Sequence, residues 1–403
     1  MQNRINLLLY LFLIPFLFLG INCGLSENGQ TGKRKVVVGA EQMNELLPLI
    51  RNKVIAVVAN QTSMVGNQHL IDTLLKDSIH IKTVFAPEHG FRGQAEAGAD
   101  VASGIDNITG LTVISLYGNH TKPTKEELKG IEMIVFDIQD VGVRFYTYIS
   151  TLQYVMEACA ENKIPLLILD RPNPNGYYVD GPVLDPKFSS FVGMNPIPIV
   201  HGLTMAEYAL MMNGEGWLKD HLKCDLIYIK TKYWDHNQYY DLPVPPSPNL
   251  PNMTSVYLYP SLCLFEGTFV SVGRGTDFPF QVIGYPGMKD TPFTFTPHSI
   301  PGKSNKPLYE GRTCSGYDLR EFGDQYINNT KQLYLFWIIE SYNKAEDKTV
   351  FFNKFFDKLA GSDLLRQQII NGTSEDSIRL SWKEGLQDYM LKRSKYILYK
   401  DFE

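Results

Sequence analysis

Short apolar runs that end at proline, glycine or a polar residue recur through the first half of the chain. Four of them cover residues 53–59, 81–86, 131–138 and 164–169, and β-branched side chains are frequent in them. Runs of this kind suit strands that are buried on both faces, as the strands of a parallel sheet are. The pattern therefore predicts an α/β fold with a mostly parallel sheet in this half.

Apolar residues at helical spacing lie between these strands. Residues 146–162 carry such a pattern, and a helix there would make the crossover to the next strand. Thr124 with Glu127, and Thr204 with Glu207, fit the capping box, in which a threonine hydroxyl and a glutamate carboxylate satisfy free amides at a helix start. We interpret Glu127 and Glu207 as helix caps and not as catalysts.

The pattern changes in the second half of the chain. Residues 241–251 hold five prolines in eleven positions, which disfavours a helix and stiffens the chain into an extended connector. Residues 259–280 are rich in glycine and aromatic side chains, and we expect irregular loop and short strand there. Helical patterns follow at residues 333–345, 350–360 and 376–392. The sequence thus predicts a second domain of the α+β class.

The N-terminal residues have the pattern of a targeting segment. Arg4 precedes an apolar stretch at residues 7–19 and then Cys23, and the apolar stretch is short for a membrane span. We predict a signal peptide over residues 1–23 and a polar tether over residues 24–34. Cys23 resembles the lipidated cysteine of bacterial lipoproteins, although an asparagine precedes it where a small residue is usual. The prediction is an exported lipoprotein anchored to the membrane through Cys23, on the periplasmic or cell-surface side; the alternative is an ordinary secretory peptide cut nearby.

Composition and motifs exclude several classes of protein. The net charge is −5 and no long basic run occurs, which argues against a nucleic-acid partner. The sequence lacks GxGxxG, the phosphate-binding GxxxxGK(S/T), GxSxG and HExxH, so we expect no nucleotide cofactor, no α/β-hydrolase chemistry and no metal. Four cysteines, without CxxC spacing, are interpreted as mostly buried small side chains, with one disulfide left open: Cys159, Cys224, Cys263 and Cys314.

Polar clusters follow three of the predicted strands, within residues 84–93, 135–148 and 166–176. The carboxyl ends of parallel strands converge on one crevice of an open α/β sheet. Acidic and basic side chains that are far apart in the sequence can therefore meet around one ligand, which indicates an enzyme or a ligand-binding protein.

Six motifs occur in an order that resembles a known family. PEHGFRG, QDVGVRFYTY, LDRPNPNG, HGLTMAE, PPSPNLP and LFEGTFVSVGRGT are similar to the motifs of the NamZ-type exo-β-N-acetylmuramidases, and the likeness runs from Val36 to the final RSKYILY. The resemblance implies a Rossmann-like domain over residues 35–240, a smaller α+β domain over residues 241–403, and an active site in the cleft between them. It also implies release of N-acetylmuramic acid from the non-reducing ends of peptidoglycan fragments in cell-wall turnover.

Two other functions remain open at this point. A non-catalytic glycan-binding lipoprotein of the cell wall would use the same aromatic and arginine residues but would not need a catalytic acid. An amidase or esterase that acts on wall peptides would release its product from the peptide and not from the sugar. A hydrolysis assay separates the three.

Hydrolysis of a glycosidic bond needs an acid for the leaving oxygen, and a second carboxylate or the substrate's acetamido group at the anomeric carbon. Glu88 is the candidate acid, because it follows Pro87 at a strand end and is held by Gly90 in a turn. His89 could orient Glu88 or contact the substrate. The alternative for Glu88 is a structural pair with Arg92.

Other acidic residues are candidates for the second catalytic group. Asp140 matches an acidic position of the QDVG motif and could orient the acetamido group or activate water; it could equally anchor its loop or pair with Arg144. Glu266 in FEGT is the reserve candidate. For Asp170, followed directly by Arg171, we favour a structural salt bridge.

The lactyl ether of muramic acid carries a carboxylate, which an arginine fork can hold. Arg274, flanked by Gly273 and Gly275, could approach a ligand closely. The remaining candidates for substrate binding are Arg92, Arg144, Tyr146, Tyr148 and Asn249, with core packing as the alternative for either tyrosine.

Overall fold

A computed structural model describes residues 34–93, 103–325 and 327–402. The predicted signal peptide, Cys23 and all but the last residue of the predicted tether lie outside these residues. Val36–Glu403 form one compact unit. Within the described part of the chain, no helix is both long and apolar enough to cross a membrane.

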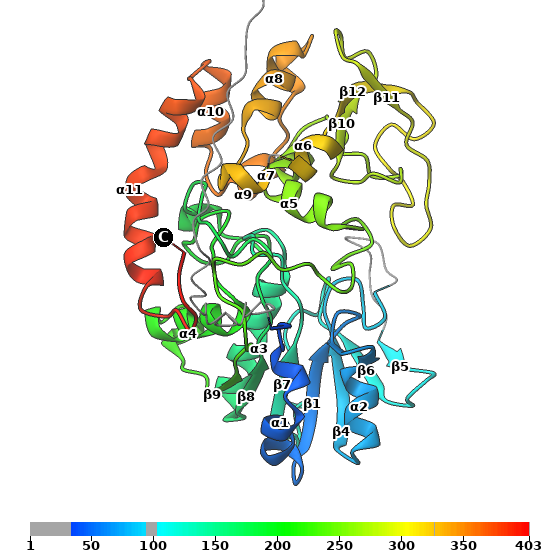
Figure 1. Cartoon of the computed structure of the whole chain (residues 1–403), viewed down its shortest axis with the longest axis vertical. Helices are drawn as coiled ribbons and strands as arrows, with labels where there is room; N and C mark the ends of the chain where they lie inside the picture. The colour runs from blue at the N-terminus through cyan, green and yellow to red at the C-terminus, as the bar shows by residue number, and fades with distance from the viewer. Residues whose placement is uncertain (1–33, 94–102, 326, 403) are drawn as a thin grey trace, which may run out of the picture. The chain divides into compact units, whose positions relative to one another are not determined.

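A seven-stranded sheet forms the centre of the first half (Figure 1). Its strands are β1 (Val54–Ala59), β4 (His80–Ala86), β5 (Gly104–Ile105), β6 (Thr112–Ser115), β7 (Met133–Asp137), β8 (Leu166–Leu169) and β9 (Leu226–Ile229). They lie in the order β5-β6-β4-β1-β7-β8-β9, and β5 is the antiparallel strand. The parallel strands thus have the 3-2-1-4-5-6 order of a Rossmann fold, which reverses between β1 and β7. The predicted α/β class is confirmed.

The strands of this sheet are buried because apolar side chains occupy both of their faces. All five residues of β7 and all four of β8 are buried, as the uninterrupted apolar runs predict. Ala59 at the end of β1 pairs in register with Asp137 at the end of β7. The segments that follow β1, β4 and β7 therefore leave the sheet at the same edge.

Helices and small elements complete the first half. They are α1 (Met43–Ile50), the hairpin β2 (Met64–Val65) and β3 (Gln68–His69), α2 (Leu70–Lys76), α3 (Tyr148–Asn162) and α4 (Met205–Glu215). The 3-10 turns of the chain are η1 (Gly39–Glu41), η2 (Pro186–Phe188), η3 (Lys219–His221), η4 (Cys263–Gly267) and η5 (Lys348–Val350). The predicted helix at residues 146–162 is α3.

The two predicted capping boxes have different outcomes. Thr204 and Glu207 form the box at the start of α4, as predicted. Thr124 and Glu127 make both contacts of a box, at 2.7 and 3.3 Å. Residues 125–130 nevertheless form turns and not a helix, so the predicted helix start at Thr124 is wrong.

The second half combines helices with a small antiparallel sheet. The helices are α5 (Met253–Leu262), α6 (Arg320–Gln325), α7 (Ile327–Thr330), α8 (Phe336–Lys344), α9 (Phe355–Ala360), α10 (Leu364–Ile370) and α11 (Glu375–Arg393). The strands β10 (Val282–Tyr285), β11 (Phe293–Phe295) and β12 (Cys314–Asp318) pair in the order β10-β12-β11. The three predicted helices overlap α8, α9 and α11.

Residues 259–267 correct one expectation, because they are helical and not irregular. Pro260 lies inside α5, where it has no N–H to donate to the carbonyl of Val256. The side-chain amide of Asn175 donates to that carbonyl instead, at 3.3 Å. A contact from a distant loop thus replaces the bond that proline removes, and the local pattern could not reveal it.

One hydrophobic core continues from the sheet into the second half. It contains Phe136 of β7 and Leu152 of α3, and also Leu264, Phe356 of α9 and Trp382 of α11. A second cluster packs on the other face of the sheet. The first core contains residues from both sides of residue 240, so it does not mark a boundary there. The predicted division into two domains at that residue stays a prediction. All four cysteines of the described chain are free and buried, as expected for small core side chains.

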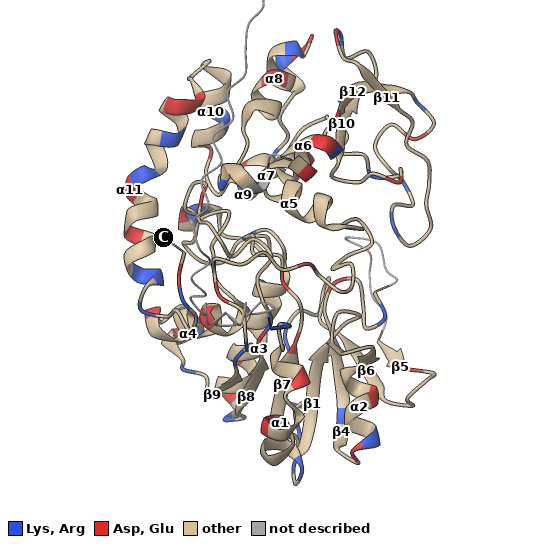
Figure 2. Ribbon diagram, in the orientation of Figure 1, with Lys and Arg blue, Asp and Glu red and all other residues tan. Residues whose placement is uncertain are grey.

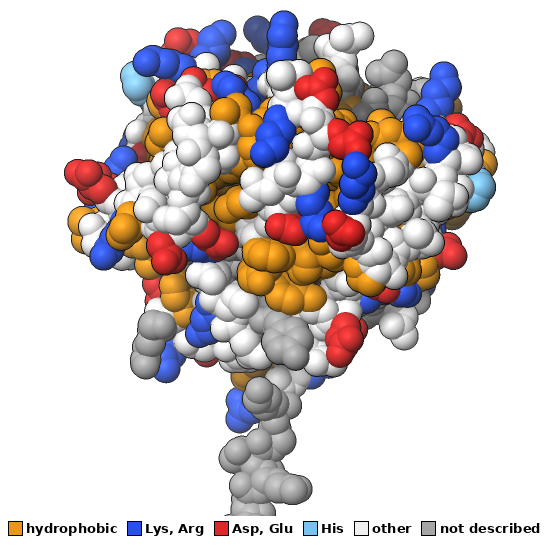
Figure 3. All heavy atoms as spheres, turned by 90° about the horizontal axis from the view of Figure 1, so that it is seen from above, with side chains coloured by type: hydrophobic (Ala, Val, Ile, Leu, Met, Phe, Trp, Pro, Cys, Tyr) orange, Lys and Arg blue, Asp and Glu red, His pale blue; other side chains and the backbone are white. Residues whose placement is uncertain are grey.

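Charged side chains are distributed over the surface with both signs mixed. Helix α11 carries acidic and basic residues along its length (Figure 2). On the face of Figure 3, hydrophobic side chains lie among Lys, Arg, Asp and Glu. In the described chain, no group of three His, Cys, Asp or Glu residues could hold a metal ion. That this protein binds neither nucleic acid nor a metal remains a prediction.

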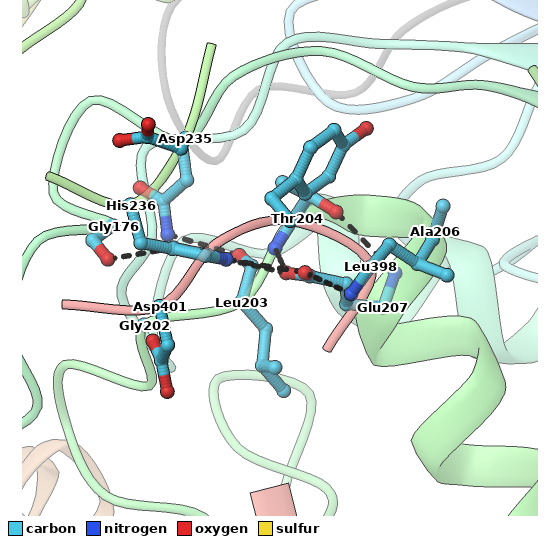
Figure 4. Close-up of polar contacts among 12 residues, drawn as sticks. Gly176, Gly202, Leu203, Thr204, Ala206, Glu207, Asp235, His236, Leu398 and Asp401 are labelled. Atoms are coloured by element: carbon cyan, nitrogen blue, oxygen red, sulfur yellow. Dashed lines mark hydrogen bonds and ion pairs between the residues drawn. The ribbon is translucent and has the colours of Figure 1, made fainter. Parts of the chain in front are cut away.

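A buried pair of Glu207 and His236 lies where the C-terminal segment meets the first half (Figure 4). Both carboxylate oxygens of Glu207 lie 3.1 Å from Nε2 of His236, and Nδ1 of His236 donates to the carbonyl of Gly176 at 2.8 Å. The carboxylate also accepts from the amides of Thr204, at 2.9 Å, and Leu398, at 2.8 Å. Glu207 therefore caps a helix, as predicted, and also anchors the end of the chain.

We predict that His236→Ala lowers the free energy of unfolding by about 3–5 kcal/mol, because it leaves a fully buried carboxylate without its imidazole partner. Urea unfolding of the wild type and the variant measures the difference. His80→Ala is the matched control, since His80 is exposed at the start of β4, and its effect should stay within about 0.5 kcal/mol. Equal effects of the two substitutions would contradict an anchoring role for this pair.

Candidate active site

A cavity of about 800 Å³ lies where the carboxyl ends of β4, β6 and β7 meet the second half of the chain. This volume is within the range of small-molecule sites, about 300–1,000 Å³. The first half contributes Glu88, His89, Tyr117 and residues 145–147, and the second half contributes Glu266, Arg274, residues 303–306 and Phe355. The cavity therefore brings together motif residues that are nearly 190 positions apart in the sequence.

A tight turn at residues 87–90 presents Glu88 to this cavity. The amide of Gly90 donates to the carbonyl of Pro87 at 3.0 Å, and the third residue of the turn, His89, has a φ of 69°. Glycine or asparagine normally fills a β-turn position with positive φ. A histidine there costs about 1–3 kcal/mol and persists where its surroundings fix it. His89 is buried, and Glu88 is partly buried.

The carboxylate of Glu88 is held by a residue from another strand end. The hydroxyl of Thr147, which precedes α3, donates to Oε2 of Glu88 at 2.7 Å. Both residues line the cavity. This hydrogen bond joins the segment after β4 to the segment after β7, and it fixes the direction of the Glu88 carboxylate. Among the described residues, Glu88 is the one acidic residue at these strand ends that lines the cavity.

Glu266 and Arg274 form an ion pair on the second-half side of the cavity. Nε of Arg274 lies 2.7 Å from Oε1 of Glu266, and Sγ of Cys263 lies 3.6 Å from the other oxygen. The guanidinium also lies over the ring of Phe280, 4.9 Å from its centroid. Burial disfavours the charged guanidinium, but Glu266 more than offsets this effect and raises the pKa of Arg274. Its two terminal nitrogens donate to none of the described residues.

A loop at residues 300–307 packs against the turn that carries Arg274. Gly275 has a φ of 82°, and a Cβ at this position would lie 2.6 Å from both the carbonyl of His298 and the ring of Pro307. The side-chain amide of Asn249 donates to the carbonyl of Lys303 at 2.8 Å. Lys303 and Lys306 line the cavity, so they add positive charge beside Arg274.

Two buried tyrosines hold the proline-rich connector against the end of β7. The hydroxyls of Tyr146 and Tyr148 lie 2.9 and 3.3 Å from the carbonyl of Pro246. Burial raises the pKa of both tyrosines, so they are hydrogen-bond donors at neutral pH. Tyr146 lines the cavity and Tyr148 does not. Their hydroxyls bind the connector, and of the two residues only Tyr146 is placed to contact a molecule in the cavity.

Comparison with known proteins agrees with this architecture. Residues 55–254 match the N-terminal domain of the family described as exo-beta-N-acetylmuramidase NamZ, and residues 257–399 match its C-terminal domain. This chain belongs to the NamZ family. The peptidoglycan beta-N-acetylmuramidase NamZ of Bacillus subtilis (strain 168) is 38% identical over 408 residues, which cover 93% of this chain and 94% of that protein.

Two solved structures share the fold of this NamZ-family chain. A DUF1343 family protein of Bacteroides fragilis NCTC 9343, solved at 1.30 Å, superposes with a TM-score of 0.85 at 46% identity and covers 91% of this chain and 100% of its own. A second such protein of the same organism, solved at 1.65 Å, has a TM-score of 0.74 at 28% identity, with coverage of 91% and 99%.

Five of the ten predicted catalytic and substrate-binding residues line the cavity of this NamZ-family protein, and five do not. Those that line it are Glu88, His89, Tyr146, Glu266 and Arg274. Those outside the lining are Arg92, Asp140, Arg144, Tyr148 and Asn249. The roles of all ten stay predictions, but the geometry supports substrate contact for the first set.

Arg92 has a structural partner. Its Nε and Nη2 donate to the two carboxylate oxygens of Asp106, at 3.1 and 2.8 Å. The guanidinium lowers the pKa of Asp106 to about 2. Arg92 thereby links the segment after β4 to the turn after β5. The alternative considered for Glu88 was a structural pair with Arg92, but the carboxylate that receives these two bonds from Arg92 is that of Asp106.

Arg144 and Asp140 are buried under the cavity wall. Arg144 donates through its terminal nitrogens to the carbonyls of Pro182, Ile197 and Leu359, at 2.7 to 2.9 Å. Asp140 accepts from the amide of Gly142 at 2.6 Å, and its Oδ2 lies 3.7 Å from Nε2 of His201. The geometry favours the alternative that Asp140 anchors its loop, although its partner is this amide and not Arg144.

The structural salt bridge expected at Asp170 involves a different acid. Arg171 donates to both oxygens of Asp137, at 2.6 and 2.9 Å, and both side chains are buried. Asp170 instead accepts from the hydroxyl of Tyr399 and the amide of Ala206. Burial raises the pKa of Asp170 to about 6. Both acids are therefore parts of the scaffold.

Several residues that line the cavity were not predicted from the sequence. Thr147 lies within the motif QDVGVRFYTY, between the two predicted tyrosines Tyr146 and Tyr148, and this motif was the sequence signal for it. Lys303 and Lys306 lie in a loop without periodicity or a named motif, and Phe355 lies within the helical pattern predicted at residues 350–360. Only the packing of the loop against Gly275 reveals the lysines as neighbours of Arg274.

Proposed function

We propose that this chain is an exo-acting β-N-acetylmuramidase that releases N-acetylmuramic acid from the non-reducing ends of peptidoglycan fragments. One observation carries the proposal: in a member of the NamZ family, one cavity holds both the carboxyl group of Glu88 and the guanidinium of Arg274, whose terminal nitrogens donate to none of the described residues. The B. subtilis relative, which matches almost the whole chain, is a peptidoglycan beta-N-acetylmuramidase by name. The products belong to cell-wall turnover.

Glu88 is the general acid in this proposal. The leaving sugar oxygen is a poor leaving group unless it receives a proton as its bond to the anomeric carbon breaks. Glu88 gives up its proton to that oxygen, water supplies the hydroxyl group of the released sugar, and the other proton of that water replaces the one that Glu88 gave up. The strained turn and the hydrogen bond from Thr147 hold the carboxyl group in one place, which removes the entropic cost of orienting it.

Arg274 gives the specificity for muramic acid. Glu266 occupies its Nε, so the guanidinium is fixed and its two terminal nitrogens remain for a ligand. A planar carboxylate such as that of the lactyl ether fits two parallel N–H donors. Glu266, predicted as the reserve catalytic group, has the geometry of a residue that positions Arg274.

Hydrolysis separates this function from a non-catalytic glycan-binding protein with the same cavity. The purified mature protein should release free N-acetylmuramic acid from a MurNAc-GlcNAc disaccharide. Binding of the disaccharide without release of either sugar would favour the binding protein. Release of peptide from a muropeptide, with the sugars left joined, would favour an amidase.

We predict that Glu88→Gln lowers turnover of MurNAc-GlcNAc by about a hundred-fold or more, since glutamine has the same size but no proton to give. An aryl glycoside with an activated leaving group should lose less, because it needs less protonation. Sugar analysis after incubation measures both rates. Glu126→Gln, at an exposed carboxylate, is the control and should be as active as the wild type. Near-normal turnover by Glu88→Gln would transfer the acid role to another residue.

We predict that Arg274→Ala lowers kcat/KM for a MurNAc glycoside by roughly ten- to a hundred-fold and leaves that for the matching GlcNAc glycoside nearly unchanged. The wild type should prefer the MurNAc glycoside by at least the same factor. The ratio of the two kcat/KM values is the measurement, and it should fall towards one in the variant.

A double variant controls for the carboxylate that Arg274→Ala leaves without a partner. Arg274→Ala with Glu266→Gln removes the stranded negative charge, so any remaining loss reports the missing cation itself. An unchanged sugar ratio in both variants, with both folded, would exclude Arg274 as the lactyl receptor and point to Lys303 or Lys306.

We also propose that the protein is exported and anchored to the membrane by a lipid on Cys23, on the periplasmic or cell-surface side. The apolar stretch that ends shortly before Cys23 supports this, as does the likeness to lipoprotein signals. Cys23→Ala should move the protein from the membrane fraction to the soluble fraction after cell disruption. Wild-type protein that is already soluble would contradict the anchor.

A further inference from the structure

We infer that Thr147 is a positioning residue that holds the carboxyl group of Glu88 in its proton-donating orientation. The inference rests on the role proposed for Glu88 and adds a residue to which no function has been assigned. Its hydroxyl lies 2.7 Å from Oε2 of Glu88, and the two residues are 59 positions apart. Thr147 is only 8% exposed, and the hydrogen bond is partly buried at the wall of the cavity.

The first line of evidence is that the hydroxyl of Thr147 does not cap its own helix, α3. Thr147 is the N-cap residue of α3, a position where a threonine side chain normally accepts a hydrogen bond from an amide of the first turn. No such bond forms here, because the backbone of Thr147 is helical, with φ −67° and ψ −4°. The helix forgoes a cap that is typically worth about 1 kcal/mol.

Three polar N-caps of the same chain do cap their helices, whereas Asp363 at the start of α10 has, like Thr147, a helical backbone and no side-chain cap. Thr204, Asn252 and Ser374 begin α4, α5 and α11, and each has an extended backbone and a side chain that accepts from an amide three residues on. The hydroxyl of Thr147 is thus turned away from its own helix towards Glu88. The local sequence does not require this, since a capping threonine is the commoner solution.

The second line of evidence is the direction of the hydrogen bond. A hydroxyl that donates to Oε2 keeps the acidic proton of the carboxyl group off that oxygen. In this inference the acidic proton is therefore carried by Oε1, in a direction that the hydrogen bond at Oε2 fixes. A general acid needs this arrangement, because its proton must point at the glycosidic oxygen when the bond breaks.

The third line of evidence is the placement of α3 itself. Burial raises the pKa of Tyr148, the first residue of α3, and the nearby charge of Glu88 contributes to the increase. The start of a fifteen-residue helix thus lies close to the carboxylate. In this inference the hydroxyl of Thr147 donates to the carboxylate of Glu88 that forms once the proton has left.

Thr147→Val tests the inference, because valine has nearly the shape of threonine and no hydroxyl. We expect kcat on MurNAc-GlcNAc to fall about ten- to a hundred-fold and KM to change by less than about twofold, as for an interaction that matters in the transition state. An activated aryl MurNAc glycoside should lose much less. Thr147→Ser keeps the hydroxyl and should retain kcat within about threefold of the wild type.

Thr204→Val is the matched control at an N-cap that does cap its helix. It should lower the free energy of unfolding, by the lost cap, and leave kcat unchanged. Thr147→Val should do the reverse, with kcat reduced and the urea midpoint close to that of the wild type. A residue that only supports the fold would lower the midpoint and affect both substrates alike.

The outcomes separate this inference from the proposed function. Normal turnover by Glu88→Gln would overturn the role of Glu88 and the inference with it. An inactive Glu88→Gln beside a Thr147→Val with wild-type kcat would overturn the inference alone. Equal losses on the disaccharide and the aryl glycoside, with a raised KM, would also contradict it, because Thr147 would then be a substrate contact.

Discussion

Hydrogen-bond donors converge on the carbonyl oxygen of Pro246, and this contact fixes how the proline-rich connector lies on the sheet. The hydroxyls of Tyr146 and Tyr148 lie 2.9 and 3.3 Å from it. The side-chain amide of Gln61 lies 2.9 Å from the same oxygen. A carbonyl oxygen has two lone pairs, so three donors saturate it. The connector cannot shift without taking this acceptor from the two buried tyrosine hydroxyls, at about 1–3 kcal/mol each.

The site depends on this fixed connector because its chemistry is divided between the two halves. Glu88 comes from a strand end, whereas Arg274 and the lysines of the 300–307 loop come from beyond the connector. Asn249, three residues after Pro246, binds the carbonyl of Lys303 and so transmits the position of the connector to that loop. A ligand that bridges an acid and a cation needs both halves held at a constant separation.

Much of the fold followed from the sequence, and much of the site did not. Uninterrupted apolar runs identified β1, β4, β7 and β8, because burial on both faces leaves a local signature. Glu88 and Arg274 were found as candidates since both lie in turns rich in glycine. Arg144 could not be placed, because its partner Leu359 is 215 positions away and a buried arginine looks like a ligand-binding one in sequence. The same holds for Asn175, whose amide lets α5 continue through Pro260.

The central claim is that a terminal MurNAc unit binds in this cavity with its lactyl carboxylate at Arg274 and its glycosidic oxygen at Glu88. The most direct measurement is a crystal structure of the Glu88→Gln variant with bound MurNAc-GlcNAc. We predict that the lactyl carboxylate accepts hydrogen bonds from the terminal nitrogens of Arg274, and that the glycosidic oxygen lies about 3 Å from the side chain at position 88. A disaccharide bound outside the cavity, or with its lactyl group directed away from Arg274, would contradict the account.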